Sequence, residues 1–167
     1  NWYAVMGIYD SASLSDASLR KEFAPVGWHV PSDAEWTTFV DYLIANGYNY
    51  DGTISGNKIA KSIASTTGWN FTTIVGAPGE DPSSNNSSGF NAFPEVSRDD
   101  DGSFISEGYQ AEFWSSTAFS SSYAWYRRSH YTQLGHERVS FLKVSGYSVR
   151  FVRDAVVSTS PTMEITS

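Results

Sequence analysis

The chain has 167 residues, with 18 Asp and Glu against 11 Lys and Arg, a formal net charge of −7 and no cysteine. This length fits one domain that buries about two thirds of its unfolded surface without disulfide bonds. The negative charge repels phosphate backbones and anionic lipids, so nucleic acid is not an expected partner. No apolar run approaches the roughly 20 residues of a membrane span, so membrane insertion is not expected either.

The N-terminal segment is expected to form a strand followed by a short helix. Aromatic and β-branched side chains mix in residues 1–8, which favours a strand. Residues 10–23 follow with Ser15 as the expected helix cap and with Leu19 and Phe23 on one face.

The clearest helix signal begins after Pro31. Ser32, followed three residues later by Glu35, forms a capping box, and Pro31 prevents an earlier start. An apolar stripe with helical spacing follows, and Gly47 supplies a left-handed stop. The members of this stripe are Trp36, Phe39, Val40, Leu43 and Ile44. The sequence therefore predicts a core helix that starts at Asp33.

A turn, a second helix and a long loop are expected next. Asp51 and Gly52 form a turn signal, and residues 57–67 place apolar side chains at helical spacing. Gly, Pro, Ser, Asn and acidic residues predominate in residues 72–91. This composition predicts a long loop of a kind that is usually either functional or mobile.

The second half of the chain is expected to be β structure. Residues 91–98 and 103–105 would pair around a turn at 99–102. Further strands are expected at residues 113–119, at 123–128, before Lys143 and at 147–153. The Ser/Thr-rich tail at 155–167 is expected to be a linker or a strand that pairs with a neighbouring unit.

Four motifs carry a family resemblance: GWHVPSDAEW at 27–36, FWSSTAF at 113–119, AWYR at 124–127 and GYSVRFVRD at 146–154. In this order they resemble the Fibrobacter succinogenes major paralogous domain, a family of secreted bacterial surface modules. The resemblance implies an α+β, C-type-lectin-like fold, with two or three helices packed on a twisted, mainly antiparallel sheet, adjacent terminal strands and a long loop. It also implies a lectin-like domain at 1–154 with a separate tail at 155–167.

The same resemblance draws attention to two missing cysteines. Family members commonly carry one Cys just before the GWHVP motif and another in the closing strand. These positions are Ala24 and Phe151 in this chain. If the two once formed one bridge, Ala24 and Phe151 are expected to lie close in the fold. Closing a loop of that length is worth about 4–5 kcal/mol in the chain-entropy model.

A recognition surface is expected between the AWYR motif and the closing strand, together with the loop at 81–90. In lectin-like relatives this region supplies the exposed end of the sheet, and Arg and Tyr often carry interface energy. The alternative is an ordinary solvated edge hairpin. The residues expected to bind the ligand are Trp125, Arg128, His130, Tyr131, Gln133, His136, Glu137 and Phe141.

Calcium is the one cofactor left open. Oxygen ligands are available from Glu80, Asp81, Asn85, Asn86, Glu95 and residues 99–101, although these residues could equally serve turns. The Glu-Pro-Asn and Gln-Pro-Asp triplets of calcium-dependent sugar-binding lectins do not occur, which disfavours that activity. No other cofactor is expected.

Catalysis is not expected. The sequence has no HExxH, GxSxG, P-loop or dinucleotide motif. Formylglycine-generating enzymes, which share the implied fold, need paired cysteines that this chain lacks. No residue is therefore assigned a catalytic role.

These observations predict a secreted or cell-surface bacterial binding module, similar to an adhesin. It would recognise an extracellular protein or glycan through an exposed surface of strands and loops. The alternative is a structural subunit of a surface fibre or appendage that assembles through its termini. In that case residues 156–165 would pair with the sheet edge of another subunit through main-chain hydrogen bonds.

Overall fold

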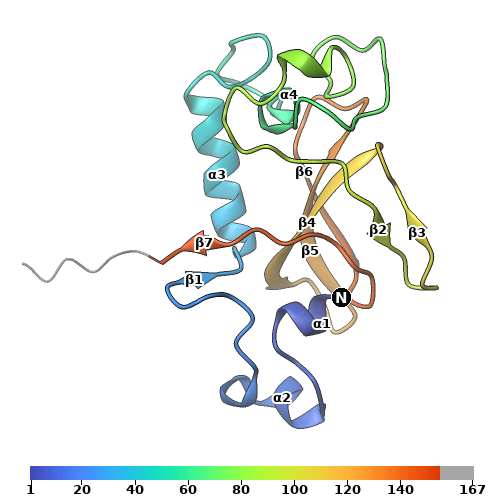
Figure 1. Cartoon of the computed structure of the whole chain (residues 1–167). Coiled ribbons are helices and arrows are strands. Elements are labelled where there is room, and N and C mark those ends of the chain that lie inside the picture. Colours follow the sequence, from blue (N-terminus) through green and yellow to red (C-terminus); the bar gives the residue numbers. More distant parts are fainter. Residues whose placement is uncertain (155–167) are drawn as a thin grey trace, which may run out of the picture.

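The computed structural model describes residues 1–154; the tail at 155–167, with its expected linker or assembly role, lies outside the described residues. Short helices and three antiparallel sheets give the described part an α+β architecture. The long helix α3 (Asp33–Ala45) stands beside a three-stranded sheet, long loops lie at one end, and a small N-terminal lobe lies at the other (Figure 1). Within residues 1–154, no helix is long and apolar enough to cross a membrane.

Helix α3 begins and ends where the sequence predicts. The Ser32 hydroxyl accepts a hydrogen bond from the Glu35 N–H at 3.2 Å, and the Glu35 carboxylate accepts one from the Ser32 N–H at 2.8 Å. Trp36 and Leu43 on the apolar stripe are buried. The chain leaves the helix through Gly47, whose φ of +77° is readily adopted only by glycine.

The central sheet contains β4 (Gln110–Ala118), β5 (Tyr123–His130) and β6 (Glu137–Leu142) in that order. Its strands are antiparallel, and side chains alternate between the two faces. Phe113 packs with Trp36 and Trp69 on the α3 side. Trp114 packs with Trp2 and Tyr126 on the other side. The sheet therefore separates two apolar cores.

Two smaller sheets complete the fold. Strand β1 (Trp28–His29) pairs with β7 (Val152–Arg153), which joins the GWHVP motif to the end of the described chain. Strands β2 (Ser97–Arg98) and β3 (Phe104–Ile105) form a hairpin around the predicted turn at 99–102.

The predicted N-terminal strand is wrong. Trp2–Val5 is the one-turn helix α1, because the Asn1 side chain accepts the Ala4 N–H at 3.0 Å. The helix at 10–23 is also shorter than predicted. Asp10 and Asp16 cap α2 (Ser11–Ser15) and the 3-10 helix η1 (Ala17–Leu19), so Ser15 ends a helix and does not start one.

Other elements are shorter than predicted because the backbone bonds to distant segments. The expected helix at 57–67 is reduced to α4 (Ala60–Ile63), after which Ser65 donates its N–H to the Ala92 carbonyl at 2.8 Å. The expected strands at 91–98 and 147–153 are reduced to β2 and β7. The long loop at 72–91 contains only the 3-10 helix η2 (Pro82–Ser84).

The segments that contain Ala24 and Phe151 lie side by side. The ring of Phe23, next to Ala24, lies 5.7 Å from the ring of Phe151, measured between centroids. Three residues beyond each position, the Asp154 N–H donates to the Gly27 carbonyl at 2.9 Å. These contacts support the expected proximity of Ala24 and Phe151.

An Ala24→Cys/Phe151→Cys double variant should form a disulfide under mild oxidation. The oxidised form should be more stable than the reduced form by up to about 4–5 kcal/mol, because the bridge restricts the unfolded chain. Urea denaturation of both forms measures this difference. The reduced form is the matched control, since it carries the same loss of the Phe151 ring. Thiols that stay free under oxidation would show that the two positions lie too far apart.

His29 connects β1, α3 and the end of β7. Its Nδ1 lies 2.6 Å from Asp154 Oδ1, and its Nε2 lies 2.7 Å from Glu35 Oε1. These hydrogen bonds, first with Asp154 and then with Glu35, raise the pKa of His29 above its ordinary value. The charged imidazolium of His29 therefore links the start of α3 to the end of the described chain.

The contribution of His29 to stability should depend on pH. Because the folded pKa is raised, this contribution is complete below about pH 6.5 and is lost as the pH rises through the folded pKa. The free energy of unfolding should therefore fall as the pH rises through the folded pKa of His29. Asp154→Asn should make this fall smaller, by less than about 1 kcal/mol, because the groups are largely exposed. Urea denaturation at about pH 6 and about pH 8.5 tests this.

Glu107→Gln is the matched control, because Glu107 is exposed and makes no side-chain hydrogen bond or ion pair within residues 1–154. If the free energy of unfolding depends on pH equally in the wild type and in Asp154→Asn, the His29–Asp154 contact does not contribute to stability.

Candidate functional site

The predicted recognition residues do not share one surface. Residues directly opposite each other on paired strands point to the same face, and successive residues alternate. Arg128 lies opposite Glu137, and Ala124 lies opposite Phe141, on the face away from α3. Trp125 points to the α3 face. The alternation of the sheet therefore divides the expected site between two faces.

Arg128 and Phe141 line a small cavity of about 140 Å³ beside the β2–β3 hairpin. Arg128 donates two hydrogen bonds to Glu137 Oε2, at 3.0 Å and 2.6 Å. Glu112 is buried at the same cavity and accepts a hydrogen bond from Ser97, and burial raises the pKa of its carboxyl. Since these charged groups bond to neighbours within the protein, we assign this cavity to the polar part of the core.

The β5–β6 loop, which carries Tyr131 and Gln133, is fixed to the body of the protein. The Gly79 N–H donates to the Tyr131 carbonyl at 3.0 Å, and the Ala60 N–H donates to the Leu134 carbonyl at 2.9 Å. Gln133 is exposed, whereas Tyr131 is half-buried. This loop thus supports α4 and the long loop.

His130 and His136 lie in different environments. His130 is half-buried, and its Nδ1 lies 2.8 Å from Thr132 Oγ1. His136 is fully buried, with its Nδ1 2.9 Å from Ser129 Oγ and its ring centroid 5.6 Å from that of Trp36. The expected position of His136 on an exposed surface is therefore wrong, because the end of the β5–β6 loop, directly before β6, places its ring in the core against Trp36 and Ser129.

Trp125 is half-buried and belongs to a surface cluster that we call the hairpin patch, formed by Phe119, Tyr123, Trp125 and Arg138. The Arg138 guanidinium carbon lies 3.4 Å from the Trp125 ring centroid, and the Phe119 ring meets Trp125 edge-on at 4.8 Å. Phe119 is 55% exposed and Tyr123 is 39% exposed. Large aromatic area and a guanidinium are thus available to solvent together.

The start of α3 holds the hairpin patch in place. Asp33 accepts hydrogen bonds from Arg138 Nε at 2.8 Å and 2.9 Å and from buried Arg127 Nη2 at 3.1 Å. Arg127 also donates to Thr37 Oγ1 at 2.7 Å. A carboxylate in the first turn is favoured by the helix dipole. The patch is therefore fixed before any ligand binds.

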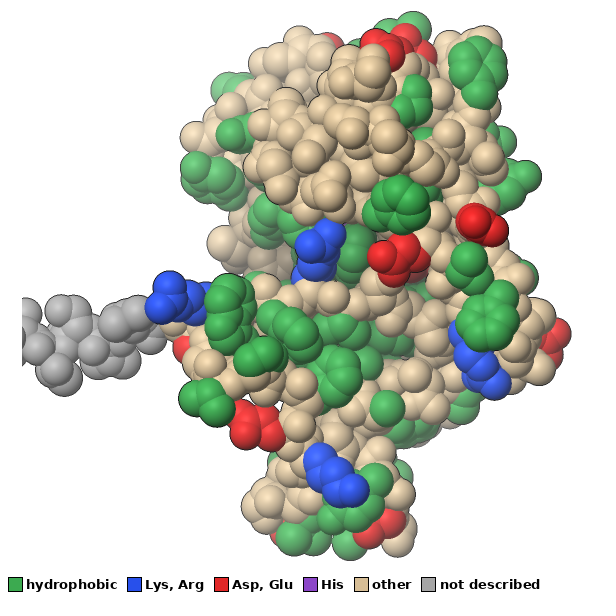
Figure 2. Space-filling model, viewed as in Figure 1, with side chains coloured by type: hydrophobic (Ala, Val, Ile, Leu, Met, Phe, Trp, Pro, Cys, Tyr) green, Lys and Arg blue, Asp and Glu red, His purple; other side chains and the backbone are tan. Residues whose placement is uncertain are grey.

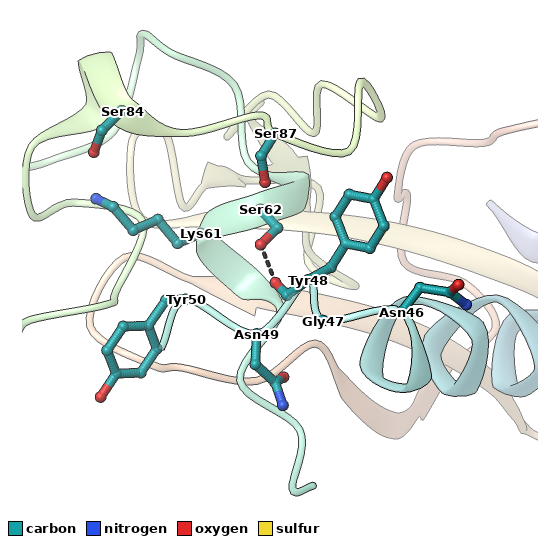
Figure 3. Close-up of a pocket in the computed structure, with 9 residues that line it drawn as sticks. All are labelled: Asn46, Gly47, Tyr48, Asn49, Tyr50, Lys61, Ser62, Ser84 and Ser87. Atoms are coloured by element: carbon teal, nitrogen blue, oxygen red, sulfur yellow. Dashed lines mark hydrogen bonds between the residues drawn. The ribbon is translucent and has the colours of Figure 1, made fainter. Parts of the chain in front are cut away.

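A second candidate site lies where the end of α3 and helix α4 meet the long loop. We call it the helix–loop pocket; its volume is about 450 Å³. Figure 3 shows Tyr48 and Tyr50 on the segment after α3, Ser62 and Lys61 on α4, and Ser84 and Ser87 on the long loop. The sequence prediction included this part of the loop at 81–90 but missed the tyrosines. The aromatic pair in YNY, directly after a helix stop, is the signal that could have identified them.

Lys61 is the one charged residue in the pocket lining, and it is already bonded. Its ammonium group donates to the Glu80 carbonyl, to Glu80 Oε2 at 3.2 Å and to the Asp81 carbonyl at 3.1 Å. Asn49 is also occupied, because its side-chain amide bonds to the backbone of residues 53–58. The groups that remain for a ligand are mainly hydroxyls.

The candidate calcium ligands do not gather in the described part of the chain. No three His, Cys, Asp or Glu side chains in residues 1–154 converge on one point. Asp81 accepts the Ser83 hydroxyl at 2.5 Å, and Asn85 is buried and donates to the Ser65 and Pro78 carbonyls. Glu95 accepts the Ser148 hydroxyl at 2.9 Å. These side chains stabilise turns and segment contacts in the structure.

Comparison with known proteins identifies one family. A family model described as the Fibrobacter succinogenes major domain matches residues 1–153. No curated protein and no solved structure matches the chain. The family match therefore covers the described part almost completely.

The three histidines should titrate differently in NMR spectra. Burial lowers the pKa of His136 to about 3, so its ring should stay neutral from about pH 7 to about pH 4. The pKa of His130 is lowered by burial and then by Arg128, whereas that of His29 is raised. His29→Asn and His130→Asn variants assign the signals.

Titration of His136 near pH 6.5 would contradict its burial.

A neutral His136 also has a consequence for stability. The unfolded chain takes up this proton near pH 6.5, so the free energy of unfolding should fall as the pH decreases from there towards about 3.

Proposed function

The chain belongs to the Fibrobacter succinogenes major domain family, and we propose that it is a secreted or cell-surface bacterial binding module with a C-type-lectin-like fold. It would act like an adhesin that recognises an extracellular protein or glycan. The observation that carries this proposal is the fixed group of aromatic and arginine side chains in the hairpin patch. No catalytic role is proposed for any residue.

The composition of the hairpin patch supports binding. Trp, Tyr and Arg are the side chains that most often dominate interface energy, because each buries a large area and keeps a directional polar group. Trp125 and Arg138 already stack at 3.4 Å, and Asp33 fixes Arg138. The side chains of the patch would therefore lose little conformational entropy when a partner binds, because they are already ordered.

The shape of the patch favours a protein over a single sugar. Phe119 and Tyr123 belong to the turn and strand beside Trp125 and extend the exposed aromatic area along the hairpin. Protein interfaces use an apolar centre with a polar rim, and Arg138, whose side chain is 45% exposed, provides a polar group beside this area.

Removal of the central ring should weaken partner binding. In biolayer interferometry against a panel of purified bacterial surface proteins and oligosaccharides, the full chain should bind at least one protein. Trp125→Ala should increase the Kd at least tenfold, which corresponds to about 1.4 kcal/mol. Tyr42→Ala is the matched control, because Tyr42 is 61% exposed on α3 and lies outside the patch.

Two results would contradict the proposal. One is a partner whose Kd is the same for Trp125→Ala and for the wild type. The other is the absence of saturable binding to every member of the panel.

A further inference from the structure

The helix–loop pocket offers hydroxyl groups without partners inside the described protein. The hydroxyls of Tyr48, Tyr50 and Ser87 make no hydrogen bond within residues 1–154. Ser62 and Ser84 donate to the carbonyls of Tyr48 and Asp81, and their oxygens can still accept. Figure 3 shows the Tyr48 and Tyr50 side chains pointing away from each other, so their free hydroxyls lie at opposite ends of the group of residues that lines the pocket.

The charges at the pocket exclude strongly ionic ligands. An anion would need a free cation, but the Lys61 ammonium already has three acceptors from Glu80 and Asp81. The net charge of −7 opposes anions further. A metal cation would need carboxylates, and none lines the pocket. The ligand is therefore expected to be uncharged.

The surroundings of the pocket also disfavour an apolar ligand. Serine and asparagine side chains make up much of its lining. Figure 2 shows that the upper part of one face, over the long loops, consists mostly of backbone and uncharged polar side chains. An uncharged ligand at this site must therefore carry many hydrogen-bonding groups of its own.

The pocket lining includes two tyrosine rings, which point away from each other (Figure 3) and pack on neighbouring segments. Gly76 lies directly against the Tyr50 ring, since a Cβ atom added to Gly76 would lie 2.4 Å from it, and its φ of +84° favours glycine. The Tyr48 ring packs on the apolar core of α3 and α4. Aromatic faces can cover the C–H face of a sugar ring while hydroxyl groups bond to its edge.

From this lining we propose that the helix–loop pocket binds an uncharged carbohydrate the size of a mono- or disaccharide. Its volume of about 450 Å³ lies within the roughly 300–1,000 Å³ of small-molecule sites. Tyr48 and Ser87 would bond to the sugar hydroxyls, and Tyr50 would cover the ring. This site is separate from the hairpin patch, and it needs no calcium because its lining has no carboxylate.

The test uses the full 167-residue chain on an array of neutral and acidic mono- and disaccharides, in buffer with a calcium chelator. The strongest neutral sugar is then titrated by isothermal calorimetry. Saturable binding of a neutral sugar in chelator is expected, with at least a tenfold loss for Tyr50→Ala. Tyr48→Phe keeps the ring and should weaken binding about fivefold, as expected for one lost hydrogen bond.

Tyr42→Phe is the matched control, since it removes a hydroxyl from an exposed tyrosine of α3 outside the pocket. Trp125→Ala should keep sugar binding, which separates this inference from the protein-binding role of the hairpin patch. Thermal melting of each variant verifies folding. The inference is overturned if no neutral sugar binds, if binding requires calcium, if acidic sugars are preferred, or if Tyr48→Phe binds as well as Tyr42→Phe.

Discussion

Burial of the central sheet on both faces is the constraint on which the rest of this structure depends. Trp114 and Tyr126 belong to one core and Phe113 to the other, so every residue of β4 and β5 is committed to a face by its position. A shift of one residue in the strand pairing would move the side chains of each core to the opposite face of the sheet. Because α1 covers one face and α3 covers the other, neither core forms without the distant segment that closes it.

The start of α3 links this core to the surface. Ser32 and Glu35 fix the first turn, and Glu35 also contacts His29, which connects to the end of the described chain. Asp33, in the same turn, fixes Arg127 and Arg138. One capped helix end therefore sets the geometry of the hairpin patch and of the β1–β7 pair. Rigid elements of this kind favour ligand binding, because few side chains and loops have to become ordered when the ligand binds.

The two proposed sites differ in chemistry because they use different parts of the fold. The hairpin patch stands on strands and presents aromatic area with a paired arginine. The helix–loop pocket is formed by three loop and helix segments and presents hydroxyls around two tyrosines. The first suits a broad protein contact, and the second suits a small polar ligand. A module with both could attach to a protein and to a glycan at the same time.

The sequence by itself determined the elements whose signals are local. The capping box and stripe of α3, the turn at 99–102 and the approximate positions of β4 and β5 all depend on neighbouring residues. The four motifs also identified the family, which the match to residues 1–153 confirms. For the candidate site, the sequence indicated Trp125 and the loop at 81–90, while it placed buried His136 at the surface.

Only the tertiary structure decided the partners of each face and each loop. The side chain of Asn1 turned an expected strand into a helix, and contacts with Leu134 and Ala92 shortened the expected helix at 57–67. The helix–loop pocket brings together Tyr48, Lys61 and Ser87 from segments far apart in the chain. Long-range hydrogen bonds and burial determine such features, and no local sequence pattern encodes which distant residue will supply the bond.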